Sequence, residues 1–250
     1  MLVINKVNLK IPQWHKEHED FKIVVLADVH AGSPFIDDSK LEKIVELVNK
    51  QKPDLILLLG DDVIHGVKGG KFIEPQITAA YYSKLKSKYG IISVLGNHDW
   101  WYNGKKVRKA LINNNIDVLE NDYRIISHNN KSFIVAGLAD LDTQNPPVKE
   151  FINSITTSNP VILLSHNPDI FPEVTEKISL TLAGHTHGGQ VIIPFYGSKV
   201  VPSKYGNRYA RGHIVEEGKH LFVSSGIGTS ILPIRFNCPP EIVVLTLESN

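Results

Sequence analysis

Cysteine is nearly absent from this sequence, and neither sign of charge is in excess. The single cysteine, Cys238, excludes an internal disulfide and supplies too few thiolates for a cysteine-rich zinc site. The 27 basic and 26 acidic residues give a formal net charge of +1, so bulk electrostatics do not indicate a polyanionic partner. No run of about 18 apolar residues occurs, which excludes an ordinary transmembrane helix.

The first residues also predict no secretory leader. The apolar start, Met1 to Val7, is short and contains Asn5 and Lys6, and neither a basic segment nor a small-residue cleavage site accompanies it. We therefore expect a soluble, cytoplasmic protein. The 250 residues, of which 42% are hydrophobic, are sufficient for a large core, and we predict a single domain over residues 1–250.

The pattern of apolar residues differs between the two halves of the chain. In the first half, apolar runs alternate with helical segments, which predicts right-handed crossovers and a largely parallel sheet. The second half consists mainly of short strand candidates interrupted by Gly, Pro and Asn. We therefore predict two packed β-sheets with helices on their outer faces. One predicted helix begins near residue 37, and four others cover residues 75–88, 105–114, 147–156 and 168–177. His15 and His18 are expected in a solvated loop.

Five apolar segments end in residues that are capable of chemistry. Polar clusters at strand ends are where α/β folds place their functional sites, so we expect these residues to share one site. They are Asp28 and His30, Asp61, Asn97 to Asp99, His166, and His185 with His187.

The composition of this cluster indicates metal binding. In Asp28-x-His30 and His185-x-His187, alternate side chains lie on one side of an extended backbone. Mixed nitrogen and oxygen donors without thiolate favour Mn²⁺, Fe²⁺ or Zn²⁺ over Ca²⁺ or Mg²⁺. The candidate ligands outnumber the four or so that one structural zinc needs. The number of candidate ligands fits two metals that share a carboxylate. Two metals about 3.5 to 4 Å apart support in-line displacement at phosphorus.

The order and spacing of the motifs resemble those of the calcineurin-like metallophosphoesterases. The resemblance rests on Asp28-x-His30, Gly60-Asp61, Gly96-Asn97-His98-Asp99, the isolated His166 and Gly184-His185-x-His187. Residues 184–190, 226–230, 233–236 and 239–242 are similar to the bacterial YaeI/YkuE-type phosphodiesterase branch. The resemblance implies a four-layered α/β/β/α sandwich, in which two mixed β-sheets are flanked by helices and a dinuclear site lies above the strand ends.

The resemblance also implies a role for each motif residue. A metal-bridging hydroxide would be the nucleophile. His98 would not be a ligand but would donate a proton to the leaving oxygen or steady the phosphate, and Asp99 would fix its tautomer. The first of two divalent metals would be held by Asp28, His30, Asp61 and His187, and the second by Asp61, Asn97, His166 and His185.

Three further residues are candidates for supporting roles at the site. Asp62 is either an acceptor behind the ligands or a turn carboxylate, and His65 either leans over the site or lies on the surface. Arg235 follows the glycine-rich residues 226–230 and is predicted to contact an anionic substrate.

The class of substrate depends on fewer features. Asp99 stands where protein serine/threonine phosphatases of this superfamily carry Glu, and the next arginine is Arg108, so the resemblance disfavours that activity. No basic, aromatic-rich extension is present, and we expect no nucleic-acid partner. We predict hydrolysis of a phosphodiester or pyrophosphate in a small-molecule, nucleotide or lipid-linked (UDP-diacylglucosamine-like) substrate. The alternatives are a broad-specificity phosphomonoesterase and a non-catalytic, metal-bound scaffold.

Residues 191–211 combine apolar side chains with four basic ones. Such a mixture next to a phosphoesterase site favours either peripheral contact with the inner membrane surface or a hairpin that packs on the core. The sequence leaves both open, and it leaves the oligomeric state open as well. The basic residues are Lys199, Lys204, Arg208 and Arg211.

Overall fold

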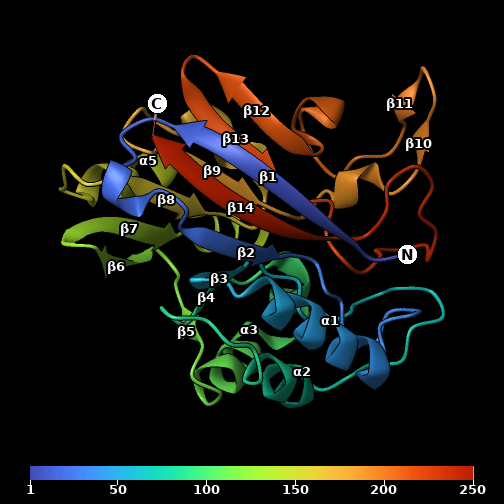
Figure 1. Ribbon diagram of the computed structural model, residues 1–250. Coiled ribbons are helices and arrows are strands. Elements are labelled where there is room, and N and C mark those ends of the chain that lie inside the picture. Colours follow the sequence, from blue (N-terminus) through green and yellow to red (C-terminus); the bar gives the residue numbers. More distant parts are fainter. Residues whose placement is uncertain (250) are drawn as a thin grey trace.

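Two six-stranded β-sheets pack face to face in the computed structural model, which describes residues 1–249, and helices cover their outer faces (Figure 1). This arrangement confirms the predicted α/β sandwich of two sheets flanked by helices. Within the described residues, no helix has the length and apolar character needed to cross a membrane.

The first sheet combines the N-terminal half of the chain with its last strand. Strands β2 to β5 are parallel, whereas β14 is antiparallel to β2 and parallel to β1. The strand order is β1 (Val3–Ile11), β14 (Glu241–Ser249), β2 (Lys22–Leu26), β3 (Leu55–Leu58), β4 (Ile91–Ser93) and β5 (Asp117–Val118). Its outer face is covered by α1 (Asp38–Gln51), α2 (Pro75–Tyr82) and α3 (Asn97–Ile112).

The second sheet comes from the C-terminal half. Its inner strands are parallel, and an antiparallel hairpin partner lies at each edge. The order is β12 (Gly212–Glu216), β13 (Lys219–Val223), β9 (Leu180–Ala183), β8 (Val161–Leu164), β7 (Lys131–Gly137) and β6 (Asp122–His128). Its outer face packs against α5 (Val148–Ser154) and the 3-10 helix η2 (Pro168–Glu173), which follow the single turn α4 (Leu141–Gln144).

Shorter elements complete the chain. Three are 3-10 helices, and the last two form a small hairpin that stands apart from both sheets (Figure 1). They are η1 (Lys16–His18), η3 (His187–Gly189), η4 (Gly206–Tyr209), β10 (Ile192–Ile193) and β11 (Gly197–Ser198).

Alternating side chains of the central strands divide between two cores. Along β2, Val24 and Leu26 pack with the helices, whereas Ile23 and Val25 face the second sheet. Successive side chains of a strand point to opposite faces, so a strand that is covered on both sides must be apolar throughout. This explains the uninterrupted apolar runs that precede the site residues.

Two helices differ from their predicted bounds in ways that affect the site. Helix α3 begins at Asn97 and is interrupted by a kink at Asn103, so the predicted helix over residues 105–114 corresponds to its second segment. The Asn-His-Asp motif forms the first turn of a segment that was not predicted. The predicted helix over residues 168–177 is only the 3-10 helix η2, which contains Pro172. A proline within a helix removes a backbone donor and clashes with the preceding turn, which is why the segment does not continue as an α-helix.

Candidate metal centre

The predicted ligands meet where five strands end. Asp28 and His30 follow β2, and Asp61 and Asn97 follow β3 and β4. The second sheet contributes the histidines after β8 and β9, which are His166, His185 and His187. All of these residues are buried except His185, which is partly exposed.

The backbone at five of these residues is in the left-handed region. The φ angles are 52° at Asp28, 44° at His30, 58° at Asp61, 68° at His185 and 50° at His187. Residues other than glycine seldom adopt this conformation, and each instance costs on the order of 1–3 kcal/mol. Strain of this kind persists where the surrounding structure enforces it. The same side chains face one another, so the strained backbone and the site coincide.

Two glycines make room for the buried carboxylates. A Cβ atom at Gly96 would lie 2.2 Å from Asp61 Oδ1, and one at Gly184 would lie 2.6 Å from Asp28 Oδ2. Because any side chain would displace these oxygens, glycine is required directly before both Asn97 and His185.

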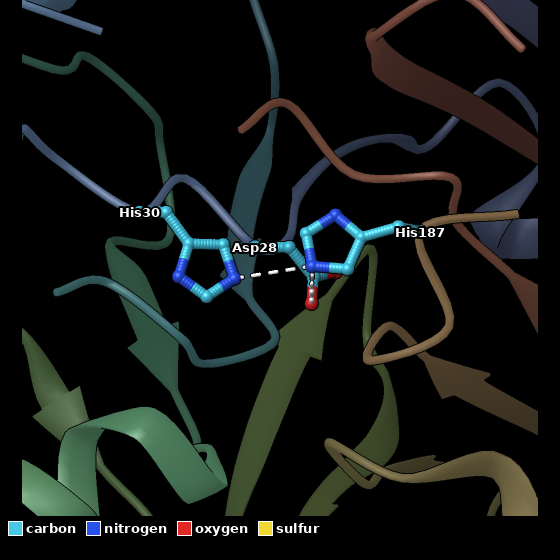
Figure 2. A group of neighbouring side chains, drawn as sticks. All are labelled: Asp28, His30 and His187. Atoms are coloured by element: carbon cyan, nitrogen blue, oxygen red, sulfur yellow. Dashed lines mark hydrogen bonds and ion pairs between the residues drawn. The ribbon is translucent and has the colours of Figure 1, made fainter. Parts of the chain in front are cut away.

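Asp28, His30 and His187 form what we call the first donor group. Figure 2 shows the two imidazoles and the carboxylate facing one another, with His30 Nε2 3.1 Å from His187 Nε2. His187 Nε2 is also 3.6 Å from Asp28 Oδ1. One donor atom from each residue lies within 4.8 Å of the others, as a shared cation would require.

Asp61, His166, His185 and Asn97 form the second donor group. The amide oxygen Oδ1 of Asn97 is 3.0 Å from His166 Nε2 and 2.9 Å from His185 Nδ1. His166 Nε2 lies 3.3 Å from Asp61 Oδ2. The first turn of α3 therefore delivers Asn97 to ligands from both sheets.

Asp61 lies between the two groups. Its Oδ2 atom is 3.5 Å from His30 Nε2 in the first group and 3.3 Å from His166 Nε2 in the second. Its other oxygen, Oδ1, accepts a hydrogen bond of 2.8 Å from the backbone N–H of His98. The backbone thus fixes the carboxylate so that Oδ2 faces both groups.

Backbone carbonyls orient two of the imidazoles. Nδ1 of His30 lies 3.1 Å from the carbonyl oxygen of Val63, and Nδ1 of His166 lies 2.7 Å from that of Leu59. A carbonyl only accepts, so Nδ1 carries the hydrogen in each neutral ring and Nε2 keeps its lone pair. Both lone pairs are directed toward the centre, as metal-binding histidines need.

Burial sets the charge of the donors. It lowers the pKa of His30 to about 3 and that of His185 to about 4, so both rings are neutral near pH 7. It raises the pKa of Asp28 to about 7. Burial also opposes the charged form of His166, but the nearby Asp61 carboxylate outweighs it and raises the pKa of His166. Imidazole nitrogens with carboxylate and amide oxygens, buried and convergent, fit borderline divalent cations.

Asp99 has a different role from the predicted one. Its carboxylate accepts hydrogen bonds from the backbone N–H groups of Asp61, Asp62, Val63 and Gly96, at 2.9 to 3.2 Å. All of its hydrogen bonds go to the backbone, so Asp99 does not fix the tautomer of His98. The prediction failed because a residue adjacent in sequence points away from its neighbour on a helix.

His98 itself lines the centre. Its side chain is nearly buried, and its Nε2 is 4.0 Å from Asp61 Oδ2. Its ring centroid is 4.6 Å from that of His30, and one nitrogen of His98 lies close enough to His30 and Asp61 to share a cation with them. The position of His98 is therefore compatible with either of two roles, proton donor or metal ligand.

Arg235, predicted to contact substrate, instead donates hydrogen bonds to backbone carbonyl oxygens of the protein. Its Nε and Nη2 atoms donate to the carbonyl oxygen of Gly228, and Nη2 also donates to that of Ser225. Its Nη1 atom donates to the carbonyl oxygens of His187 and Cys238. These contacts use the guanidinium donors, and Nη2 also lies 3.3 Å from His187 Nδ1. Arg235 thus ties a loop to the first donor group.

Four further residues border the centre. Asp62 accepts a hydrogen bond of 2.7 Å from the Tyr82 hydroxyl, and His65 is exposed with its ring 6.3 Å from that of His98. Trp101 is 53% exposed with its ring 4.8 Å from that of His98. Asp142 was not predicted, and its Oδ2 lies 3.6 Å from His185 Nε2. The residues after β7, which include Asp142, are a sixth polar strand end and would have been found by the same reasoning.

Comparison with known proteins identifies the class. The family model described as calcineurin-like phosphoesterase matches residues 21–189, and the chain belongs to this family. The protein is accordingly a metal-dependent phosphoesterase, which confirms the resemblance described above.

The chain is similar to individual proteins over most of its length. The chain is 34% identical to the uncharacterized metallophosphoesterase YkuE of Bacillus subtilis, over 92% of this chain and 80% of the relative. It is 32% identical to phosphodiesterase YaeI of Escherichia coli, over 91% and 82%. Among solved structures, the NAD nucleotidase of Haemophilus influenzae shares the fold, with a TM-score of 0.54 and 17% identity, but this chain spans only 44% of its length.

Proposed function

We propose that the protein is a phosphodiesterase or pyrophosphatase that uses two divalent cations, with Mn²⁺, Fe²⁺ and Zn²⁺ as the candidates. The position of Asp61 is the main support, because Oδ2 is 3.5 Å from His30 Nε2 and 3.3 Å from His166 Nε2. A carboxylate oxygen that faces two sets of donors is suited to a ligand shared by two cations.

The cations, when bound, would lower the pKa of a water and neutralise charge on the phosphoryl oxygens. The remaining steps belong to side chains of this protein. His98 supplies the proton that the leaving oxygen takes up, a role in which histidine typically contributes about 10²- to 10⁴-fold. The His98 backbone N–H holds Asp61 Oδ1 at 2.8 Å and so keeps the shared carboxylate in place.

Two observations favour a diester over a monoester. A phosphate monoester has an additional negative charge near neutral pH, and arginine is the side chain best suited to bind it. The donors of Arg235 are already directed at carbonyl oxygens of the protein. The similarity to a protein named phosphodiesterase YaeI points the same way.

The test is hydrolysis by metal-stripped protein resupplied with Mn²⁺. Bis-p-nitrophenyl phosphate should be hydrolysed with a higher kcat/KM than p-nitrophenyl phosphate, and activity should rise with Mn²⁺ up to two equivalents. Preference for the monoester would replace the proposal with a phosphomonoesterase. Two bound metals without turnover of either ester would indicate a scaffold.

A further inference from the structure

An apolar hollow of about 390 Å³ adjoins the metal centre. It lies between the β10–β11 hairpin with the residues that follow it and a second loop over residues 230–234. Its lining includes His187 of the first donor group, with Thr186 and Gly189 beside it. The hollow and the metal centre therefore share His187 as a wall.

The lining is suited to hydrocarbon. Its size falls in the range of ligand sites, about 300 to 1,000 Å³. Among the described residues that line the hollow, Lys199 is the one that carries a charge, and none is acidic. The other side chains are mostly aliphatic, among them Val191, Ile193, Val201 and Leu232.

Two polar side chains of the lining, Gln190 and Ser198, are already occupied. The Gln190 amide donates to the carbonyl oxygen of Leu232 and accepts from the backbone N–H of Ser230. The Ser198 hydroxyl donates to the carbonyl oxygen of Gly189. A nucleobase needs hydrogen-bond partners when it is buried, and these side chains do not offer them.

Apolar side chains also extend from the rim into solvent. Ile231 is 68% exposed and has a φ of 60°, and Phe195 is fully exposed with a φ of 68°. A positive φ is a genuine outlier for a β-branched residue, and such strain is found mainly at functional sites. Folding gains nothing from holding these side chains in water, so a function in binding is the better explanation.

We propose that the hollow binds the hydrocarbon chain of a lipid-linked phosphodiester whose phosphate is hydrolysed at the metal centre. This inference rests on the proposed function and names its substrate class. The occupant follows from the shared wall at His187, the hydrocarbon lining and the cation Lys199, which together match one molecule with an anionic phosphate and an apolar tail. The hairpin strands span only two residues each, so they offer little edge for pairing with a protein strand.

The test is a series of p-nitrophenyl alkyl phosphates with methyl, butyl, octyl and dodecyl chains. The Mn²⁺-loaded full chain is assayed below the micelle concentration of each ester. kcat/KM should rise by about threefold to fourfold for each methylene that enters the hollow, mainly through a lower KM, and should then level off. A flat series with active hydrolysis of bis-p-nitrophenyl phosphate overturns this inference alone, whereas inactivity toward that diester overturns the proposed function.

Two substitutions place an acidic group in the hollow. Ile234→Asp and Val200→Asp change lining residues that are 54% and 74% exposed, so the fold should tolerate both. The octyl-to-methyl ratio of kcat/KM should fall by about tenfold or more. Ile125→Asp is the matched control, since Ile125 is 57% exposed on β6 and outside the hollow, and its ratio should match the wild type. An unchanged ratio in both variants overturns the inference. A flat chain-length series together with binding to anionic phospholipid vesicles also overturns it, because the apolar rim would then be assigned to contact with a bilayer.

Discussion

The Asp99 carboxylate accepts a hydrogen bond of 2.9 Å from the backbone N–H of Asp61, the residue that lies between the two donor groups. Together with its bonds to Asp62, Val63 and Gly96, this contact joins the loop after β3 to the start of α3. A residue of the catalytic motif therefore holds the backbone of a candidate ligand, rather than the ring of its neighbour.

Asp99→Asn should destabilise the protein. The variant amide presents N–H groups to backbone donors that now have a carboxylate, and buried donors left unpaired cost about 1–3 kcal/mol in unfolding free energy. Thermal and urea unfolding, compared with the exposed control Asp20→Asn, measure this loss. Wild-type stability with a shifted pH profile of kcat would instead restore the tautomer role for Asp99.

His98→Ala should keep both metals while turnover falls by about two to four orders of magnitude, because only a proton donor is removed. Metal content by mass spectrometry and kcat on bis-p-nitrophenyl phosphate separate the two effects. His213→Ala, on the distant strand β12, is the control. Loss of a metal from His98→Ala would make His98 a ligand, an outcome that its position next to His30 and Asp61 permits.

Substitutions in the donor groups should differ in the number of metals they affect. His185→Ala removes a donor of the second group only, and the bound Mn²⁺ should fall from two equivalents toward one. Asp61→Asn should weaken both sites, because Oδ2 faces both groups. Calorimetric titration of metal-stripped protein gives the stoichiometry. Equal losses in the two variants would contradict the bridging position of Asp61.

Metal affinity should fall as the pH drops below about 7. A ligand carboxylate must be ionised, and burial raises the pKa of Asp28 to about 7, so binding at lower pH displaces its proton. The loss should reach about tenfold per pH unit for each proton displaced. His30 and His185, with pKa values of about 3 and 4, are neutral throughout and add no dependence above pH 5. His166, whose pKa is raised by the Asp61 carboxylate, adds a second proton that a bound metal must displace. Titrations between pH 5.5 and 8 in buffers of different ionisation enthalpy count the protons, and an affinity that does not change over this range would contradict the raised pKa.

Arg235→Lys should lower stability more than substrate affinity. Lysine cannot satisfy all the carbonyl oxygens that Arg235 binds, and unpaired buried acceptors cost about 1–3 kcal/mol. Melting temperature and metal retention should both decrease, with KM for bis-p-nitrophenyl phosphate nearly unchanged at saturating metal. A tenfold or greater rise in KM at wild-type stability would reinstate Arg235 as a substrate contact.

Much of the site could be predicted because its ligands belong to local patterns. Each candidate ligand directly follows a strand, and a strand buried on both faces has an apolar run that is plain in the sequence. Bounds were harder to predict. Helix α3 starts at Asn97, and the motif forms its first turn. This start was not predicted because Asn, His and Asp have weak helix propensity.

Other features depend on partners that are distant in sequence. His18, expected to be exposed, is fully buried, with its ring 5.2 Å from that of Trp14 and 5.3 Å from that of Phe133 on β7. A charged segment does not reveal that an aromatic cluster will cover one of its histidines.

The sequence by itself determined the class of the protein, the two sheets and the identity of the candidate ligands, since strand periodicity and short motifs are local properties of the chain. Only the tertiary structure decided that Asp61 Oδ2 faces both donor groups, that Asp99 and Arg235 bind backbone rather than His98 or substrate, and that an apolar hollow adjoins His187. These relationships join segments such as residues 190–202 and 230–234, whose distance in space is set by how the elements pack and not by any local pattern.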